Sequence, residues 1–243
     1  MTRAILLSDI HANLVALEAV LSDAHRDAAV WVTGDTVGYG PDPVDVLAAL
    51  RERDAFLVAG NHDLAVAGKM GVNEFNREAA DAALMHRSLL SAEDRDLLGA
   101  MPLIATRDSF TLVHGSLRDP VWEYVLDRSA ARACLQLAET PHCCNGHTHI
   151  PAVFEWRDGR GSVVARQPRE GEVIDLTKGR VLLNPGSVGQ PRDGDPRAAW
   201  LEVDTETRTA TFHRTRYDIP ETQRRMRRRG LPPFLAERLA YGY

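Results

Sequence analysis

The alternation of short apolar runs with helical patterns at the start of the chain constrains the fold most. Apolar runs at residues 4–7, 30–32 and 56–58 predict buried strands. Between them, residues 13–26 and 43–53 have the apolar spacing of amphipathic helices, and a proline stands in the first turn of the second. This strand-helix-strand-helix-strand order favours a parallel sheet with crossover helices.

The middle and later parts of the chain predict more helices and then a series of short strands. Helical patterns cover residues 74–90 and 129–138, and Ser91 is typical of a residue that starts a helix. Further strands are expected at residues 109–113, 141–144, 153–156, 162–165, 181–183, 198–203 and 210–213. The short runs are separated by Gly, Pro and Asp, which favour turns.

The length and the last residues bear on domain organisation. A chain of 243 residues suits one large domain or two small ones. Residues 220–243 are expected to be helical, with a break at residues 230–233. Because no obvious linker interrupts the chain, we predict a single domain over residues 1–243 with two packed sheets. A C-terminal helical extension is expected from about residue 220.

Composition excludes some classes of protein. The net charge of −5 argues against a general polyanion binder, so recognition of phosphate has to be local. No apolar run is long enough to span a bilayer, and the first ten residues do not resemble a secretory signal. Three cysteines, two of them adjacent at Cys143 and Cys144, make a poor disulfide framework. A cytoplasmic protein is therefore expected.

Polar residues follow the ends of the predicted strands. Asp9 and His11 follow the first strand, and Asp35 follows the second. The later strand ends are followed by Asn61, His62, His114, His147 and His149. In open α/β sheets, ligands bind beyond the carboxyl ends of the strands, so these side chains should share one rim. If the chain is extended there, residues two apart point to the same side, which would turn Asp9 and His11 to one site.

These side chains suit divalent cations. Carboxylate oxygen and neutral imidazole nitrogen favour manganese, iron or zinc. Because no cysteine joins the set, a thiolate zinc site is disfavoured. The simpler interpretation of a single Asp or Asn after a strand is a helix cap or a turn, but the histidines at the same strand ends favour metal binding.

The motifs DxH, GD, GNHD, HG and GHTH, in that order, resemble those of the calcineurin-like metallophosphoesterases. The run Asn-Pro-Gly-Ser at residues 184–187 is similar to an element of the small bacterial and archaeal members. The motifs extend from Asp9 to Ser187. The resemblance implies a four-layer α/β/β/α sandwich with two mixed sheets flanked by helices, and a phosphoesterase activity.

The resemblance also implies roles for individual residues. It implies that Asp9, His11 and His149 hold one divalent ion, that Asn61, His114 and His147 hold a second, and that Asp35 bridges them. A hydroxide bound to both ions would be the nucleophile, and His62 would donate a proton to the leaving oxygen. Manganese is the expected metal, while iron, zinc and nickel suit the same ligands.

Departures from the family bear on the substrate. Protein phosphatases of the superfamily carry GDxVDRG, and here Gly38 and Tyr39 stand in place of the Asp and Arg of that motif. The run from Tyr39 to Pro43 resembles a bacterial subgroup linked to nucleotide and diester hydrolysis, including diadenosine tetraphosphate. We therefore expect a small phosphoester or nucleotide substrate, with Tyr39 and Arg192 as contacts. Alternatively, Tyr39 is a packing aromatic and Arg192 forms a surface ion pair.

Other interpretations remain open at this point. The same motifs would suit a serine/threonine protein phosphatase, a nuclease, or a non-catalytic metal-binding scaffold. Nucleic acid is not expected as a partner, because the arginine-rich run at residues 224–229 has no interleaved aromatics and predicts a solvated helix face. Asn13 is expected to cap a helix. The histidines outside the motifs are expected on the surface or in ordinary hydrogen bonds: His25, His86, His142 and His213.

Overall fold

The computed structural model describes residues 3–156 and 162–243, which form two mixed sheets of six strands. The first sheet has the order β3-β2-β1-β11-β12-β9. Its strands are β1 (Arg3–Leu7), β2 (Ala29–Thr33), β3 (Phe56–Val58), β9 (Val173–Asp175), β11 (Ala198–Asp204) and β12 (Thr209–Thr215). The strands β1, β2 and β3 are parallel, as the strand-helix alternation predicted, and the others join antiparallel.

The second sheet has the order β4-β5-β6-β10-β7-β8. Its strands are β4 (Ile104–Arg107), β5 (Phe110–Val113), β6 (His142–Cys144), β7 (Ala152–Trp156), β8 (Val163–Arg166) and β10 (Arg180–Asn184). Here β5, β6 and β10 are parallel, and the outer strands pair antiparallel. Cys143 and Cys144 are buried strand residues, as expected. The strands β4 and β9 were not predicted.

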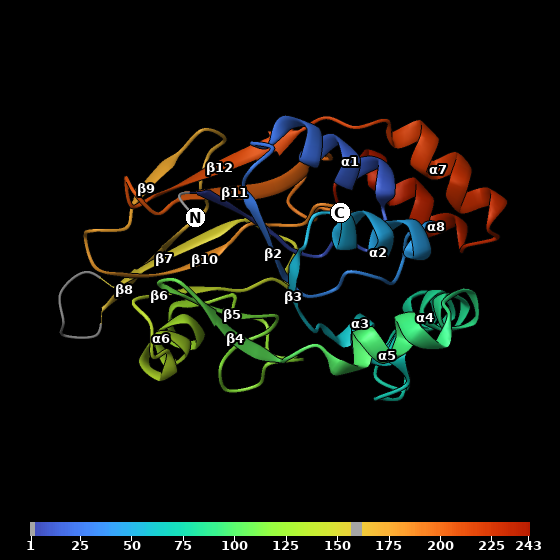
Figure 1. Ribbon diagram of the computed structural model, residues 1–243, viewed down its shortest axis with the longest axis horizontal. Coiled ribbons are helices and arrows are strands. Elements are labelled where there is room, and N and C mark those ends of the chain that lie inside the picture. The colour runs from blue at the N-terminus through green and yellow to red at the C-terminus, as the bar shows by residue number, and fades with distance from the viewer. Residues whose placement is uncertain (1–2, 157–161) are drawn as a thin grey trace.

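Apolar faces on both sides of each sheet produce four layers. Leu6 of β1 packs between the sheets against Phe110 of β5, while its neighbours Ile5 and Leu7 face outward. Helices α1 (Leu14–Asp23) and α2 (Pro43–Glu52) lie on the outer side of the first sheet, and α6 (Arg128–Leu137) lies on the outer side of the second (Figure 1). The predicted α/β/β/α sandwich is confirmed.

The remaining helices gather at the ends of the sheets seen on the right of Figure 1. They are α3 (Asn61–Ala67), α4 (Arg77–Leu89), α5 (Ala92–Ala100), α7 (Ile219–Arg228), α8 (Pro233–Glu237) and a 3-10 turn (Arg238–Ala240). The expected caps are present: the side chain of Asn13 accepts a hydrogen bond from Ala16 N, and that of Ser91 accepts one from Asp94 N. Helix α3 was missed because the motif residue Asn61 itself begins it.

The C-terminal helices pack beside the rim that the strand ends form. Leu231 and Leu235 join a core with Tyr39 and residues of α4. In the arginine-rich run, Arg225 forms ion pairs with Asp42 and Glu221 and the neighbouring arginines are exposed, which agrees with a solvated helix face. Within the described ranges, no helix combines the length and the apolar character that crossing a bilayer requires.

Candidate metal centre

Residues that follow the carboxyl ends of five strands meet at one edge of the two sheets. The loops after β1 and β2 carry Asp9, His11 and Asp35, helix α3 begins after β3, and the loops after β5 and β6 carry the later histidines. The seven side chains expected as ligands are all buried: Asp9, His11, Asp35, Asn61, His114, His147 and His149. We call these seven residues the polar floor, because they lie at the bottom of a pocket described below.

The two residue pairs Asp9/His11 and His147/His149 of the polar floor were expected on extended chain, and they are not extended. The φ angles are 51° at Asp9, 49° at His11, 68° at His147 and 60° at His149, all in the left-handed region. Such conformations cost about 1–3 kcal/mol each and persist only where surrounding structure enforces them. Here His11 N donates to Asp35 O at 2.9 Å, and the carboxylate of Asp9 accepts from His147 N.

One group of ligand atoms forms between the loops after β1 and β6. Nδ1 of His11 lies 3.1 Å from Val37 O, and Nδ1 of His149 lies 2.6 Å from Gln190 O. Because a carbonyl only accepts, both Nδ1 atoms carry the proton and both Nε2 atoms present lone pairs. The two Nε2 atoms are 3.1 Å apart, and Asp9 Oδ1 is 3.3 Å from that of His149. Acceptors facing one another in this way fit a cation.

A second group lies between the loops after β3, β5 and β6. His114 donates its Nδ1 proton to Thr33 O at 2.9 Å. Its Nε2 lies 3.0 Å from Asn61 Oδ1 and 3.0 Å from His147 Nδ1. The other ring nitrogen of His147 is buried and has no hydrogen-bond partner in the part of the chain that the structure describes. This group also fits a cation.

Asp35 connects the two groups. Its Oδ2 lies 3.7 Å from His11 Nε2 and 3.4 Å from His114 Nε2, while its Oδ1 accepts a hydrogen bond from His62 N at 2.9 Å. Burial alone raises the pKa of Asp35, but the surrounding histidines outweigh burial and hold that pKa well below its ordinary value. Although burial lowers the pKa of His114, the Asp35 carboxylate raises it to about 9.

The charge of the floor explains why cations fit it. The pKa of Asp9 is also lowered, because His149 and His114 outweigh the effect of burial, so two carboxylates are ionised out of contact with water. Burial lowers the pKa of His11 well below its ordinary value and that of His147 to about 3, so these rings stay neutral. The raised pKa of His114 lets its ring compensate only one of the two buried carboxylates, and divalent cations would supply the positive charge that is still needed.

His62 lies at the start of α3 beside the floor. Its ring centroid is 4.5 Å from that of Tyr39 and 4.8 Å from that of Phe75. Its Nδ1 finds no hydrogen-bond partner among the described residues. Burial lowers the pKa of His62 to about 4, which Asp35 offsets only in part. The neighbouring Asp63 instead caps α3, because its carboxylate accepts from Gly60 N at 3.0 Å and from Val37 N at 3.1 Å.

The segment after β10 supports the floor from behind. Ser187 Oγ donates to Asp9 O at 2.7 Å. Asn184 Nδ2 donates to Gly146 O at 2.7 Å and to Thr148 Oγ1 at 3.1 Å. The Asn-Pro-Gly-Ser element therefore fixes the loops after β1 and β6 in their left-handed conformations.

A pocket of about 130 Å³ opens above the floor. Its lining comprises Asp35, Tyr39, Asn61, His62, Glu74, Phe75, Asn76, Ala79, Trp122, Tyr124, His147, His149 and Arg192. Tyr39 and Arg192, the expected substrate contacts, thus face the same space as the floor. Three aromatic residues of this lining were not predicted from the sequence, and we call them the aromatic wall: Phe75, Trp122 and Tyr124. The alternating Trp and Tyr shortly after His114 were the one signal for it.

Arg192 lies between two tyrosines of the pocket. Its Cζ is 5.8 Å from the ring centroid of Tyr39, and its Nη2 donates to Gln190 Oε1 at 2.8 Å. Burial raises the pKa of Tyr39 and of Tyr124, and Arg192 acts in the opposite sense on both hydroxyls. Its Nε is buried and lacks a partner within the described ranges, so the guanidinium retains donor capacity beside the pocket.

His86 supports the loop that carries Tyr39. It is fully buried, its Nδ1 accepts from Gly38 N at 3.0 Å, and its Nε2 donates to Gly40 O at 2.7 Å. These bonds hold Tyr39 at a φ of 57°. His86 is thus an ordinary hydrogen-bonded histidine, as expected, and both of its bonds go to the loop that carries the pocket residue Tyr39.

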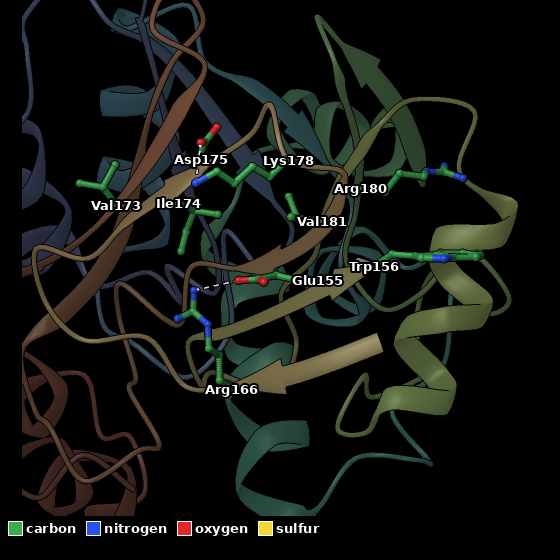
Figure 2. Close-up of a pocket in the computed structure, with 9 residues that line it drawn as sticks. All are labelled: Glu155, Trp156, Arg166, Val173, Ile174, Asp175, Lys178, Arg180 and Val181. Atoms are coloured by element: carbon green, nitrogen blue, oxygen red, sulfur yellow. Dashed lines mark hydrogen bonds and ion pairs between the residues drawn. The ribbon is translucent and has the colours of Figure 1, made fainter. Parts of the chain in front are cut away.

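A second cavity, of about 430 Å³, contains none of the motif residues (Figure 2). It is lined by Glu155, Trp156, Arg166, Val173, Ile174, Asp175, Lys178, Arg180 and Val181. Arg166 pairs with Glu155 at 3.0 Å and Lys178 pairs with Asp175 at 3.1 Å. Because acids neutralise these cations, the cavity lacks the convergent ligand atoms that mark the polar floor.

Two packed mixed sheets with acids and imidazoles converging at their carboxyl edge define a metallophosphoesterase fold. The profile of the calcineurin-like phosphoesterase superfamily domain matches residues 2–206. The chain therefore belongs to this superfamily, and it is a metal-dependent hydrolase of phosphate esters with a dinuclear divalent metal site.

Two known proteins resemble the chain along nearly its whole length, and a third resembles about half of it. A metallophosphoesterase from Sphaerobacter thermophilus is 42% identical, covers 100% of this chain and 99% of its own, and superposes with a TM-score of 0.90. An uncharacterised protein of Methanocaldococcus jannaschii is 32% identical over 97% of this chain and 96% of its own. A symmetrical bis(5'-nucleosyl)-tetraphosphatase of Thioalkalivibrio sulfidiphilus is 33% identical over 55% of this chain. The matched region covers only 50% of that relative's length.

Proposed function

We propose that this enzyme hydrolyses a phosphoanhydride or phosphodiester bond in a small nucleotide. The pocket above the polar floor has a volume of only about 130 Å³, which suits a small ester better than a protein loop. The partial likeness to symmetrical bis(5'-nucleosyl)-tetraphosphatases supports a nucleotide substrate. The replacement of the phosphatase Asp and Arg by Gly38 and Tyr39 argues in the same direction.

In this proposal Asp9, His11 and His149 hold one cation, Asn61, His114 and His147 hold the other, and Asp35 is shared. The main support for this proposal is the position of the Nε2 atoms of His11 and His149, which lie 3.1 Å apart. Neither Nε2 atom carries a proton, because each ring donates its proton from Nδ1 to a backbone carbonyl. When bound, divalent cations lower the pKa of water and neutralise charge on the transferred phosphoryl group. Manganese is the proposed metal because the ligands are imidazoles and hard oxygens.

His62 is the proposed proton donor to the leaving oxygen. Its ring lines the pocket, and its Nδ1 is not engaged by any described residue. A phosphate placed beside the ring adds negative charge, which favours the protonated form. Tyr39 and Arg192 are the proposed substrate contacts, because Arg192 presents a guanidinium to phosphate oxygens at the edge of the same pocket.

We also propose a reducing, cytoplasmic environment. The three cysteines are buried and unpaired, and Sγ of Cys134 and Cys143 are 3.8 Å apart without a bond. Free buried thiols are usual where thiols are kept reduced. The proposal is checked by locating the tagged protein in cell fractions, where recovery outside the cytoplasm would contradict it.

The activity is tested by removing metal with a chelator, restoring manganese, and assaying dinucleoside polyphosphates, cyclic nucleotides, mononucleotides and phosphopeptides. We expect hydrolysis of at least one nucleotide class, restored by manganese, and its loss in His62→Ala. The matched control is His25→Ala, because His25 is exposed and far from the pocket in the fold.

The same assay separates the alternatives. Full activity in His62→Ala would remove the proposed donor. A preference for phosphopeptides would indicate a protein phosphatase, and salt-sensitive cleavage of DNA or RNA would indicate a nuclease. Metal binding without turnover of any ester would favour a scaffold and overturn the proposed hydrolysis.

A further inference from the structure

Two separate loops bring aromatic rings together at the mouth of the pocket. Phe75 precedes α4, whereas Trp122 follows β5 in the chain. Their ring centroids are 5.4 Å apart with planes at 72°, an edge-to-face contact that holds both rings in place. The ring of Phe75 also meets His62 edge-to-face at 4.8 Å. The wall is therefore joined directly to the proposed proton donor.

Tyr124 continues the wall on the other side of the floor. Its ring stacks on His147 with centroids 3.9 Å apart and planes within 15°. The side chain is nevertheless 47% exposed. His147 covers one face of the ring, and the exposed part of Tyr124 is available to a ligand in the pocket that it lines. A flat ligand ring could extend this stack.

The loop that carries these rings is fixed by its own hydrogen bonds. Asp119 Oδ1 accepts from Val121 N at 3.2 Å and from Trp122 N at 3.1 Å, and Gly115 N donates to Pro120 O at 2.8 Å. Val125, beyond the rings, is buried in the core against α6. Because the rings are already positioned, a ligand that stacks on them orders little of the protein when it binds.

We propose that the aromatic wall stacks the base of the nucleotide whose phosphate lies at the polar floor. This inference rests on the proposed nucleotide hydrolysis. Stacking on aromatic side chains is the common way to hold any nucleobase, because every base has a π-face. Glu74 and Asn76 are exposed beside the rings and offer polar atoms to the base edges, which an alkyl group could not use. Arg192 remains available for the phosphates.

The test compares ligands that share phosphates but differ in the base. In the full-length, manganese-loaded protein, Trp122→Leu should raise the ratio of KM for adenosine triphosphate to KM for inorganic tripolyphosphate about tenfold or more. The kcat for adenosine triphosphate should change far less, and Trp122→Phe should restore most of the KM. Calorimetry should show the same weakening for adenosine monophosphate but not for inorganic phosphate.

The matched control is Trp156→Leu, at the cavity of Figure 2, which should leave the KM ratio unchanged. Equal losses for tripolyphosphate and adenosine triphosphate in Trp122→Leu would make Trp122 a structural residue and overturn the inference. The inference would also be overturned if the wild type bound adenosine monophosphate no more tightly than inorganic phosphate. If neither triphosphate is hydrolysed, the proposed hydrolysis of this class fails, while the calorimetry still decides whether the wall binds a base.

Discussion

The two sides of the pocket are built in opposite ways. The polar floor is buried, has left-handed backbone at five of its seven residues, and draws its side chains from five strand ends of both sheets. The aromatic wall is partly exposed, and none of its three residues has a positive φ. The floor is therefore a strained and fixed arrangement, as chemistry at a metal requires, whereas the wall is relaxed and presents surface for recognition. Changes to the floor should be costly, and changes to the wall should be selective.

The change expected to have the largest effect removes the shared charge of the floor. In Asp35→Asn, one neutral amide replaces a carboxylate that lies near ligand atoms of both groups. We expect turnover to fall more than the roughly 10–100-fold that losing an outer partner of a metal ligand costs. Metal content per chain, measured by mass spectrometry, should fall with it. Asp45→Asn, on the exposed side of α2, is the control. Unchanged metal content and turnover would show that Asp35 is not shared.

A smaller effect is expected behind the floor. Asn184→Ala removes the bonds to Gly146 O and Thr148 Oγ1 that hold the loop of His147 and His149. Metal affinity should fall about 10–100-fold, because the ligands remain but are no longer oriented. Competition with a chelating dye measures this affinity, and Asn73→Ala at an exposed position is the control. An affinity equal to the wild type would mean that the loop keeps its shape without Asn184.

The packing of the floor is tested by a pair of glycines with similar backbone. Gly34 has a φ of 90°, and a Cβ there would lie 2.5 Å from His114 Nδ1. Gly171 has a φ of 75°, and a Cβ there would meet nothing within 4 Å. Both alanine variants place a residue with a Cβ at a positive φ and so share that free-energy cost. Gly34→Ala should therefore lose about 1–3 kcal/mol more free energy of unfolding than Gly171→Ala, because only Gly34→Ala overpacks its surroundings. Urea denaturation measures the difference, and equal losses would show that the floor can shift.

The residues of the floor and the parallel strands β1, β2 and β3 could be predicted from sequence because both are encoded by local patterns. Continuous apolar runs predicted the strands around Leu6 and Trp31, and the order of the motifs predicted seven side chains that are all buried in the floor. The conformation that joins them could not be predicted, since Asp9 and His11 ordinarily avoid positive φ. The expected convergence is confirmed, but it comes from hydrogen bonds between distant loops and not from extended chain.

Other elements were missed for physical reasons that differ. The strand β4 is mostly exposed and β9 has only three residues, so neither carries an apolar alternation. Helix α3 starts inside a motif, where Asp63 caps it through Gly60 N. The wall depends on a loop that folds on Asp119 and on a contact between Phe75 and Trp122, and no local pattern specifies such a contact.

The smallest expected effect lies at the seam between floor and wall, where His86 holds the Tyr39 loop. Burial lowers the pKa of His86 to about 4 from its ordinary value of 6.5. Between about pH 4 and pH 6.5 the His86 ring binds a proton in the unfolded chain but not in the native protein. The contribution of neutral His86 to the free energy of unfolding is therefore complete above pH 6.5 and decreases as the pH falls. His86→Gln can keep both bonds, because its amide oxygen accepts from Gly38 N and its NH₂ donates to Gly40 O.

From pH 7 to pH 5.5, the wild type should therefore lose about 1 kcal/mol more free energy of unfolding than His86→Gln. Urea midpoints at the two pH values measure this difference, and the shared titration of the floor cancels in it. His25→Gln, at an exposed histidine, should show the wild-type loss. Equal losses in the wild type and His86→Gln would mean that the native ring takes up a proton over this pH range as readily as the unfolded chain does, and so becomes charged in the native protein. A charged ring could not accept from Gly38 N, so the loop that places Tyr39 between floor and wall would need another support.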